Sequence, residues 1–138
     1  MSGIRGIGVA VALLTAVVAC GKPQQQPSDD GPGTSLTITV TADEGATPKV
    51  YTLTCDPVGG NHPEPQAACD LLAQVGADIF EPTPTDQACT QVFGGPQTAT
   101  VVGNLDGAKI DARFSRQNGC EINRWDTLGT TLFVVPLQ

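Results

Sequence analysis

Five cysteines are the residues of this chain whose type and number best indicate covalent chemistry. Four of them lie in one region, at spacings that two closed loops would explain: Cys55, Cys69, Cys89 and Cys120. Four thiols can pair in three ways, and counting alone leaves all three open. Disulfides are typical of small exported domains that cannot build a large core. The fifth cysteine, Cys20, is left over from these pairings, so we expect it to undergo a reaction other than disulfide formation.

Cys20 follows a 19-residue leader that has the layout of a secretory signal peptide. Arg5 is the only charge ahead of an apolar run over residues 6–19, and this run is shorter than the roughly 20 residues that span a bilayer. The leader ends in Val17-Val18-Ala19-Cys20, which resembles the bacterial lipobox, whose cysteine is lipidated and becomes the mature N-terminus. Lipidation implies palmitoyl and other acyl chains that anchor the protein to the outer, extracytoplasmic face of the cell membrane. A conventional signal peptide cut nearby is the alternative.

A flexible tether is expected over residues 20–34. Residues 21–33 contain no apolar side chain beyond their prolines, so this stretch cannot bury anything. At this length, such a chain holds the domain about 20 Å from its anchor. The remaining residues, 35–138, are enough for one domain and too few for two.

The composition argues against several classes of function. Six of the seven basic residues and all 14 acidic ones follow the leader, which gives the remainder a formal charge of −8 and argues against nucleic-acid binding. The chain has no phosphate-binding glycine motif, no nucleophile elbow and no calcium loop. The single histidine, His62, has no neighbouring Cys or second His and is expected to serve a structural turn. We therefore expect neither an enzyme nor a cofactor or metal site.

Alternating apolar residues predict five strands. The pattern is clearest over residues 35–41, where Leu36, Ile38 and Val40 alternate with threonines. The other strands are expected at 49–55, 97–103, 108–114 and 130–135. Asn104-Leu105-Asp106-Gly107 indicates a hairpin between the third and fourth strands, because Gly107 tolerates positive φ.

One helix is predicted between the second and third strands. Pro63 or Pro65 can begin it and Gly76 ends it, with an apolar stripe between them at Ala68, Leu71, Leu72 and Val75. A second, short helix is expected near residues 121–126. The expected fold class is α+β: a five-stranded antiparallel sheet with one main helix and one short helix packed on one face, and two disulfides.

Several short motifs occur in an order that is specific when they are taken together. They are Leu53-Thr54-Cys55, Gly60-Asn61-His62-Pro63-Glu64-Pro65 with Ala68-Cys69, Val75-Gly76-Ala77-Asp78, and Asn118-Gly119-Cys120-Glu121-Ile122-Asn123. In combination they closely resemble the Streptomyces subtilisin inhibitor family, and the likeness runs from about Ser35 to Phe133. The resemblance implies a five-stranded sheet with two helices, the pairings Cys55–Cys69 and Cys89–Cys120, and homodimers formed through the outer sheet face.

In that family the protease-contacting loop begins at the third cysteine, two residues before the scissile bond. The resemblance therefore implies a reactive bond between Gln91 and Val92, with contacting neighbours on both sides: Ala88 at P4, Cys89 at P3, Thr90 at P2, and Phe93 after the bond. Asn118 corresponds to the family's supporting asparagine through its Asn-x-Cys match, with two extra residues near Arg116 and Gln117.

These expectations describe a lipid-anchored inhibitor of serine proteases. Gln91 lacks the cation that a trypsin-type pocket binds, so a subtilisin-like protease is expected as the partner rather than a trypsin-like one. Ala88 would add little apolar burial, which predicts weaker binding than a larger side chain would give. The alternative is a surface lipoprotein that uses the same scaffold as a non-inhibitory protein-binding or structural module.

Overall fold

The computed structural model describes residues 21 and 33–135. The expected signal peptide, the lipidation site Cys20 and nearly all of the expected tether lie outside the described residues. Within the described part, no helix is both long and apolar enough to cross a membrane.

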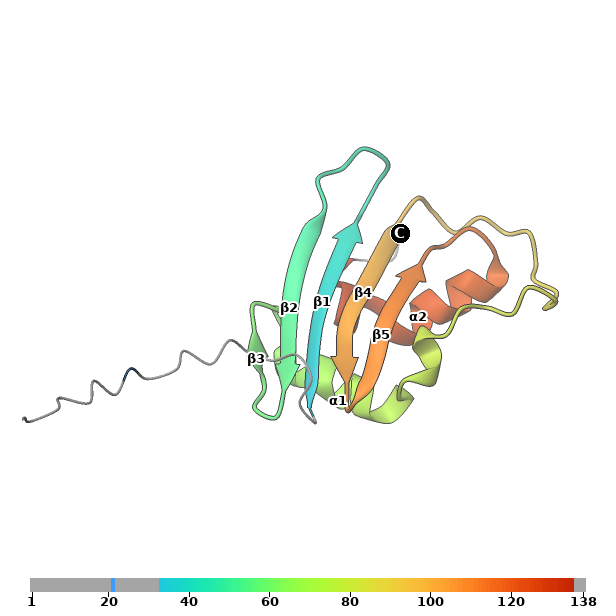
Figure 1. Cartoon of the computed structure of the whole chain (residues 1–138). Coiled ribbons are helices and arrows are strands. Elements are labelled where there is room, and N and C mark those ends of the chain that lie inside the picture. The colour runs from blue at the N-terminus through green and yellow to red at the C-terminus, as the bar shows by residue number, and fades with distance from the viewer. Residues whose placement is uncertain (1–20, 22–32, 136–138) are drawn as a thin grey trace, which may run out of the picture.

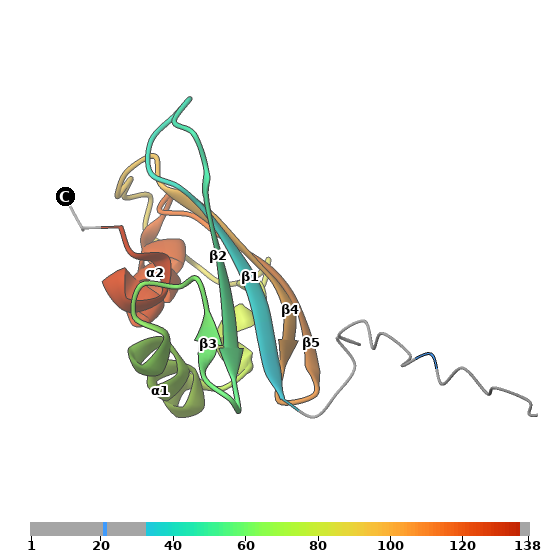
Figure 2. The same ribbon diagram turned by 90° about the vertical axis from the view of Figure 1, so that its left-hand side faces the viewer.

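The domain is a single antiparallel sheet with its helices on one face. The strands are β1 (Thr34–Thr41), β2 (Lys49–Cys55), β3 (Gly59–Gly60), β4 (Thr98–Leu105) and β5 (Ala108–Phe114), in the spatial order β3-β2-β1-β4-β5. The helices are α1 (Pro65–Val75), a short 3₁₀ turn at Asp78–Phe80, and α2 (Gly119–Phe133). Figure 2 shows α1 and α2 on the same side of the sheet. The predicted fold class is confirmed.

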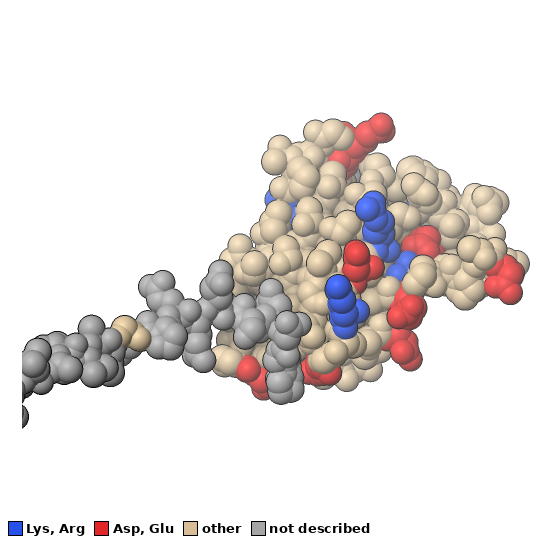
Figure 3. Space-filling model, viewed as in Figure 1, with Lys and Arg blue, Asp and Glu red and all other residues tan. Residues whose placement is uncertain are grey.

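Successive residues of the central strand β1 point alternately to the inner face of the sheet, which the helices cover, and to its outer face. Leu36, Ile38 and Val40 are each no more than 2% exposed, because the alternating pattern turns them all toward the helices. Their threonine neighbours point to the outer face. There β5 alternates Lys109, Asp111 and Arg113, so charges of both signs are interspersed on the surface in Figure 3.

The hairpin between β4 and β5 was predicted correctly. Leu105 pairs with Ala108, which leaves Asp106 and Gly107 as a two-residue turn with φ of 49° and 89°. Positive φ at both positions matches the twist of the flanking strands. The Gly107 N–H donates to Asn104 Oδ1 at 2.7 Å, which explains the asparagine at the start of the turn.

Helix α1 begins and ends close to the predicted residues. Pro65 is its first residue, and Gly76 follows its last with φ of 68°, a value that favours glycine. Cys69 lies in α1 and bonds to Cys55 at the end of β2. One of the two disulfide pairings implied by the resemblance is therefore present at the junction of sheet and helix.

The strand predicted for residues 130–135 is wrong. Thr130–Phe133 belong to α2, which has 15 residues and a non-helical Gly129 at φ 52°. Trp125, Leu128 and Leu132 are buried at helical spacing, and the Trp125 ring lies 4.5 Å from that of Phe133, so packing overrides the strand propensity of this segment. The second helix is accordingly longer than the short helix expected near residues 121–126.

The fifth strand is instead the two-residue β3. Gly59 pairs with Thr54 and Gly60 with Leu53. A Cβ on Gly60, whose φ is 100°, would overlap the carbonyl of Thr52, so only glycine allows this approach. The side-chain oxygen of Asn61 then accepts from the Thr52 N–H at 2.6 Å and prolongs the pairing.

His62 has a structural role, as the sequence indicated. Its side chain is buried, and its Nδ1 accepts from the Glu64 N–H at 3.1 Å at the start of α1. Its Nε2 then carries the proton and donates to the Leu132 carbonyl at 3.0 Å. The imidazole thereby joins the turn before α1 to the end of α2.

Candidate functional site

The segment of residues 88–96, here called the 88–96 loop, contains every residue of the predicted protease contact. It has no regular secondary structure and extends sideways past β5, the edge strand of the sheet, beside α2 (Figure 1). It enters β4 at Thr98, the residue that pairs with Thr41 at the far end of β1. Groups from outside the loop hold it in place on both sides.

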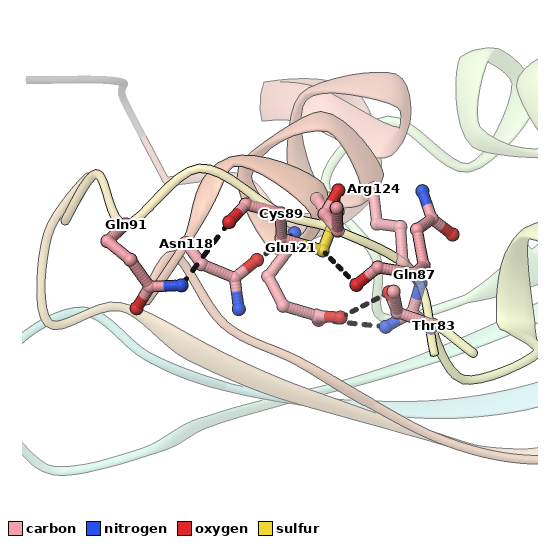
Figure 4. The surroundings of a disulfide bond; sticks show 9 residues. Thr83, Gln87, Cys89, Gln91, Asn118, Glu121 and Arg124 are labelled. Atoms are coloured by element: carbon pink, nitrogen blue, oxygen red, sulfur yellow. Dashed lines mark hydrogen bonds and ion pairs between the residues drawn. A yellow bond between two sulfur atoms is a disulfide. The ribbon is translucent and has the colours of Figure 1, made fainter. Parts of the chain in front are cut away.

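The first half of the loop is attached to the start of α2. Cys89 forms a disulfide with Cys120, the second pairing implied by the resemblance (Figure 4). One residue later, the Thr90 carbonyl accepts from the Gly119 N–H at 2.9 Å. A Cβ on Gly119 would overlap the Thr90 hydroxyl, so a larger residue at this position would force the Thr90 side chain to move. A covalent bond and a backbone hydrogen bond therefore fix two successive residues.

The second half of the loop is attached to Arg116, just after β5. The Gly94 N–H donates to the Arg116 carbonyl at 2.7 Å, and Arg116 Nε donates to the Gly94 carbonyl at 2.9 Å. Arg116 Nη1 also forms an ion pair with Asp126 Oδ1 at 2.6 Å. A Cβ on Gly94 would lie 2.8 Å from Ile122, so the loop rests directly on α2 here. Gly94 is thus held on both its amide and its carbonyl side.

Between these two attachments lie Gln91, Val92 and Phe93, all exposed. Val92 is 56% exposed and Phe93 is 67% exposed, which are large fractions for apolar side chains. Gln91 folds back along the loop, and its Nε2 donates to the Cys89 carbonyl at 3.3 Å (Figure 4). The arrangement presents three side chains to solvent from a backbone that is fixed on either side.

The segment that precedes the loop is also attached to α2. Thr83 Oγ1 donates to Glu121 Oε1 at 2.6 Å, and the other oxygen of Glu121 pairs with Arg124 Nη1 at 2.9 Å. Arg124 Nη2 donates further to the Ile79 carbonyl at 3.3 Å. Figure 4 shows Thr83, Glu121 and Arg124 gathered beside the Cys89–Cys120 disulfide. One helix therefore supports both the loop and its approach.

Asn118, expected to support the loop, occupies the N-cap of α2. Its Oδ1 accepts from the Glu121 N–H at 3.1 Å, and within residues 33–135 its side chain makes no hydrogen bond to the loop backbone. Capping orients the first turn of the helix, where Gly119 and Cys120 hold the loop. Any support from Asn118 therefore acts through those two neighbours.

Arg116 and Gly119 are the contact residues that sequence reasoning missed. Arg116 was one of two extra residues that fell outside the family pattern, and its only signal was a cation close to the fourth cysteine of the domain. Gly119 belonged to the Asn118-Gly119-Cys120 motif but was assigned no role. The roles of both depend on α2 lying beneath the loop, which no local pattern reveals.

The 88–96 loop offers a surface for binding another protein. Within residues 33–135, no group of three or more His, Cys, Asp or Glu side chains is placed to hold a metal ion. The distinguishing feature is an exposed segment without regular secondary structure whose backbone is held on both sides. Such a segment is suited to enter the cleft of a protein that binds extended peptides.

Several known proteins resemble this chain in sequence or in fold. A family described as "Subtilisin inhibitor-like" matches residues 32–118. Subtilisin inhibitor-like protein 1 of Streptomyces cacaoi is 37% identical over 80 residues, which cover 55% of this chain and 72% of that protein. The subtilisin inhibitor of Streptomyces violaceus is 31% identical over 129 residues, covering 85% and 88% respectively. The crystal structure of Streptomyces caespitosus sermetstatin in complex with Bacillus licheniformis subtilisin aligns over 75% of this chain and 97% of that chain, with 25% identity and a TM-score of 0.47.

Proposed function

The chain belongs to the subtilisin inhibitor-like family, a family of protease inhibitors rather than enzymes, and from that premise we propose that it inhibits a serine protease through the Gln91–Val92 bond. The observation that carries the proposal is the attachment of the loop on both sides of this bond. Thr90 is held one residue before Gln91, and Gly94 is held two residues after Val92. A protease would therefore meet a substrate-like segment that cannot move apart after cleavage.

Cleavage of such a bond is reversible on the protease. The serine oxygen of the protease bonds to the Gln91 carbonyl carbon, the C–N bond to Val92 breaks, and the Val92 nitrogen takes the proton that the serine gave up. The new amine stays close to the acyl group because Gly94 is still attached. It can attack the ester, re-form the amide and return the proton to the serine. Intramolecular reactions of this kind have high effective concentrations.

The same attachments favour tight binding. A flexible peptide loses conformational freedom when it enters a protease cleft, at a cost of about 1–2 kcal/mol for each residue fixed. Cys89, Thr90 and Gly94 are already fixed in the free protein, so less freedom remains to be lost. The exposed side chains of Val92 and Phe93 add apolar surface that can be buried in the complex.

The side chains of the loop favour a subtilisin-like protease. Gln91 is neutral, so it has no charge for the acidic pocket of a trypsin-like enzyme. Ala88 is too small to fill an apolar subsite. The larger apolar residues, Val92 and Phe93, lie after the proposed scissile bond, so the amine side would supply much of the buried area.

Membrane anchoring through Cys20 is the second part of the proposal. It is supported by the lipobox-like Val17-Val18-Ala19-Cys20 and agrees with the layout of the sheet. Thr34 and Thr41 lie at opposite ends of β1, about 24 Å apart, and the loop joins the sheet at the Thr41 end. A domain held from the Thr34 end would present its loop away from the anchor. We expect Cys20→Ala to release the protein into the medium, and retention of this variant on membranes would overturn the anchor.

A homodimer through the outer sheet face is the third part. Val50 and Val102, which are 52% and 48% exposed, lie on β2 and β4 and flank the threonines of β1. Their exposure supports a contact between two copies. Sedimentation of the purified domain tests it, and a monomer at high micromolar concentration would remove this part alone.

The inhibitory function is tested by titrating the domain against subtilisin and trypsin. We expect subtilisin inhibition with slow, limited cleavage between Gln91 and Val92. Gln91→Lys should add trypsin inhibition, because the new cation reaches the acidic specificity pocket. Gln74→Lys on the exposed surface of α1 is the matched control and should add none. A folded domain that leaves both proteases active at micromolar excess would favour the non-inhibitory binding or structural module.

A further inference from the structure

We propose that Arg116 is a positioning residue that keeps the amine side of the cut loop in place, and that it thereby determines how readily the Gln91–Val92 bond re-forms. This inference rests on the proposed function, because it concerns the same bond. It goes beyond that function by assigning re-formation of the bond to a side chain outside the loop and outside the disulfides.

The contacts of Arg116 form a two-sided clamp on Gly94. The Arg116 carbonyl accepts from the Gly94 N–H at 2.7 Å, while its Nε donates to the Gly94 carbonyl at 2.9 Å. The second bond has a charged donor, and such bonds contribute more than neutral ones. The side chain therefore adds a strong contact that the backbone alone does not provide.

Burial and charge fix the guanidinium in this orientation. The Arg116 side chain is only 10% exposed, and a buried cation requires partners to offset its lost hydration. Asp126 on α2 supplies one at 2.6 Å from Nη1. With Nη1 held by Asp126, Nε faces the Gly94 carbonyl. The ion pair thus fixes the position of the loop relative to α2.

The two sides of the proposed bond are held in different ways. On the acyl side, Cys89 is covalently joined to Cys120, so cleavage cannot release it. On the amine side there is no covalent attachment near the bond, and the first fixed residue is Gly94. The new amine on Val92 lies two residues from that point, which limits its reach to about 7 Å. The Gly94 clamp is therefore what confines the amine.

Without the clamp, the next residue fixed by the sheet is Thr98, which pairs with Thr41. The free segment would then lengthen from two residues to six. Because effective concentration falls roughly as the −3/2 power of segment length, threefold lengthening lowers it about fivefold. The cut form would also gain conformational freedom, so the balance between cut and intact protein should shift toward the cut form by a similar factor.

The experiment compares Arg116→Gln with the wild-type domain in the presence of a small amount of subtilisin. The two halves of a cut domain stay joined through Cys89–Cys120, so a reducing gel separates cut from intact protein. The backbone hydrogen bond from the Gly94 N–H remains in the variant, so we expect the cut-to-intact ratio at equilibrium to rise by up to about fivefold. Inhibition should also become temporary as cut protein accumulates. Incubation that starts from purified cut protein should show slower re-formation of the bond.

Two further variants separate positioning from general stability. Arg113→Gln removes an exposed arginine side chain on the outer face of β5 and should leave the ratio at the wild-type value. Arg116→Lys keeps a cation but cannot span both Gly94 and Asp126, so it should restore part of the wild-type ratio. The melting temperature is recorded for each variant, because a merely structural role would lower it without changing the ratio.

The outcomes distinguish this inference from the function on which it rests. A wild-type ratio in Arg116→Gln, with or without a lower melting temperature, overturns the role of Arg116 while inhibition by the wild-type domain stands. Failure of the wild-type domain to inhibit overturns the proposed function. In that case exchange of the Gly94 amide with deuterated solvent still tests the clamp. We expect faster exchange in Arg116→Gln by about tenfold, and unchanged exchange would overturn it.

Discussion

Two exposed loops of this domain differ in what holds them. Residues 42–48 connect β1 to β2, and within residues 33–135 their hydrogen bonds stay inside the loop: Asp43 accepts from the N–H groups of Glu44 at 2.7 Å and Ala46 at 3.0 Å. The 88–96 loop is held by groups from outside itself, through the Cys120 disulfide and the hydrogen bonds to Gly119 and Arg116. Both loops project from the sheet in Figure 1, so exposure does not distinguish them.

This difference indicates that the fate of a loop cut by a protease depends on the contacts that residues outside the loop make with it. A protease can cut either loop, because both offer accessible backbone. After cleavage, the new ends of the 42–48 loop are held only by the pairing of β1 with β2, which begins at Val40 and Lys49. The 88–96 loop keeps both ends at fixed points within a few residues of the cut. We therefore expect a cut bond to re-form more readily in the 88–96 loop than in the 42–48 loop.

Removal of the external crosslink should have the largest effect. We expect the double change Cys89→Ser with Cys120→Ser to lower the free energy of unfolding by about 3–4 kcal/mol, because the bond closes a separation of 31 residues. It should also convert the inhibitor into a substrate, since the acyl side is no longer held. Thermal unfolding and a time course of cleavage by subtilisin measure the two effects.

The other disulfide is the control for this prediction. Removal of the Cys55–Cys69 bond, with a separation of 14 residues, should cost about 3 kcal/mol of stability and leave the loop attachments intact. Inhibition measured well below the melting temperature should persist. Equal loss of inhibition in both double variants would show that general stability, rather than loop attachment, controls the function.

One glycine substitution in each loop tests the difference between the two loops, and we expect its effect on stability to be intermediate in size. Gly94→Ala places a Cβ 2.8 Å from Ile122, and overpacking of this kind typically costs about 1–3 kcal/mol. The loop must shift, so we expect faster cleavage between Gln91 and Val92. Gly45→Ala lies in open space but at φ of 77°, which costs about 1–2 kcal/mol through the backbone alone.

The two alanine variants should therefore lose comparable stability with different consequences. Gly45→Ala should unfold at a lower temperature and inhibit like the wild-type domain. Gly94→Ala should be cut faster. If Gly45→Ala were also cut faster between Gln91 and Val92, the two loops would not be independent and the contrast between them would fail.

Asn118 should give the smallest effect. Asn118→Ala removes the N-cap of α2 and is expected to cost about 1 kcal/mol, with only a slight increase in the rate of loop cleavage. Asn118→Ser keeps a capping oxygen but has no amide, and should behave like the wild-type domain in unfolding and cleavage assays. If the serine variant were cut much faster than the wild-type domain, the amide itself would act on the loop and capping would not explain its role.

Several elements could be predicted because neighbouring residues determine them. The alternation of Leu36, Ile38 and Val40 defines β1, and positive φ at Gly107 and Gly76 closes the hairpin and ends α1. Thr130–Phe133 were misassigned because their strand propensity conflicts with the burial of Phe133 against Trp125, eight residues earlier in α2, and against Phe114 on β5. The strand β3 has no pattern at all, since it consists of two glycines.

The candidate site was only partly accessible to the same reasoning. The disulfide pairings were implied by the family resemblance and not by counting, because four cysteines alone leave three pairings open. The position of the proposed reactive bond also depends on that resemblance. Arg116 could not be assigned, because its contact with Gly94 spans 22 residues and requires Asp126 to be in place on α2.

By itself, the sequence determined the local elements, the division of apolar and polar residues between the two faces of the sheet, and the chemistry available in the Gln91–Val92 segment. Only the tertiary structure decided which groups hold that segment, because Cys120, Gly119 and Arg116 reach it only when α2 packs beneath the loop. Local patterns depend on interactions between near neighbours. Attachment of a loop depends on distances between residues that folding alone brings together.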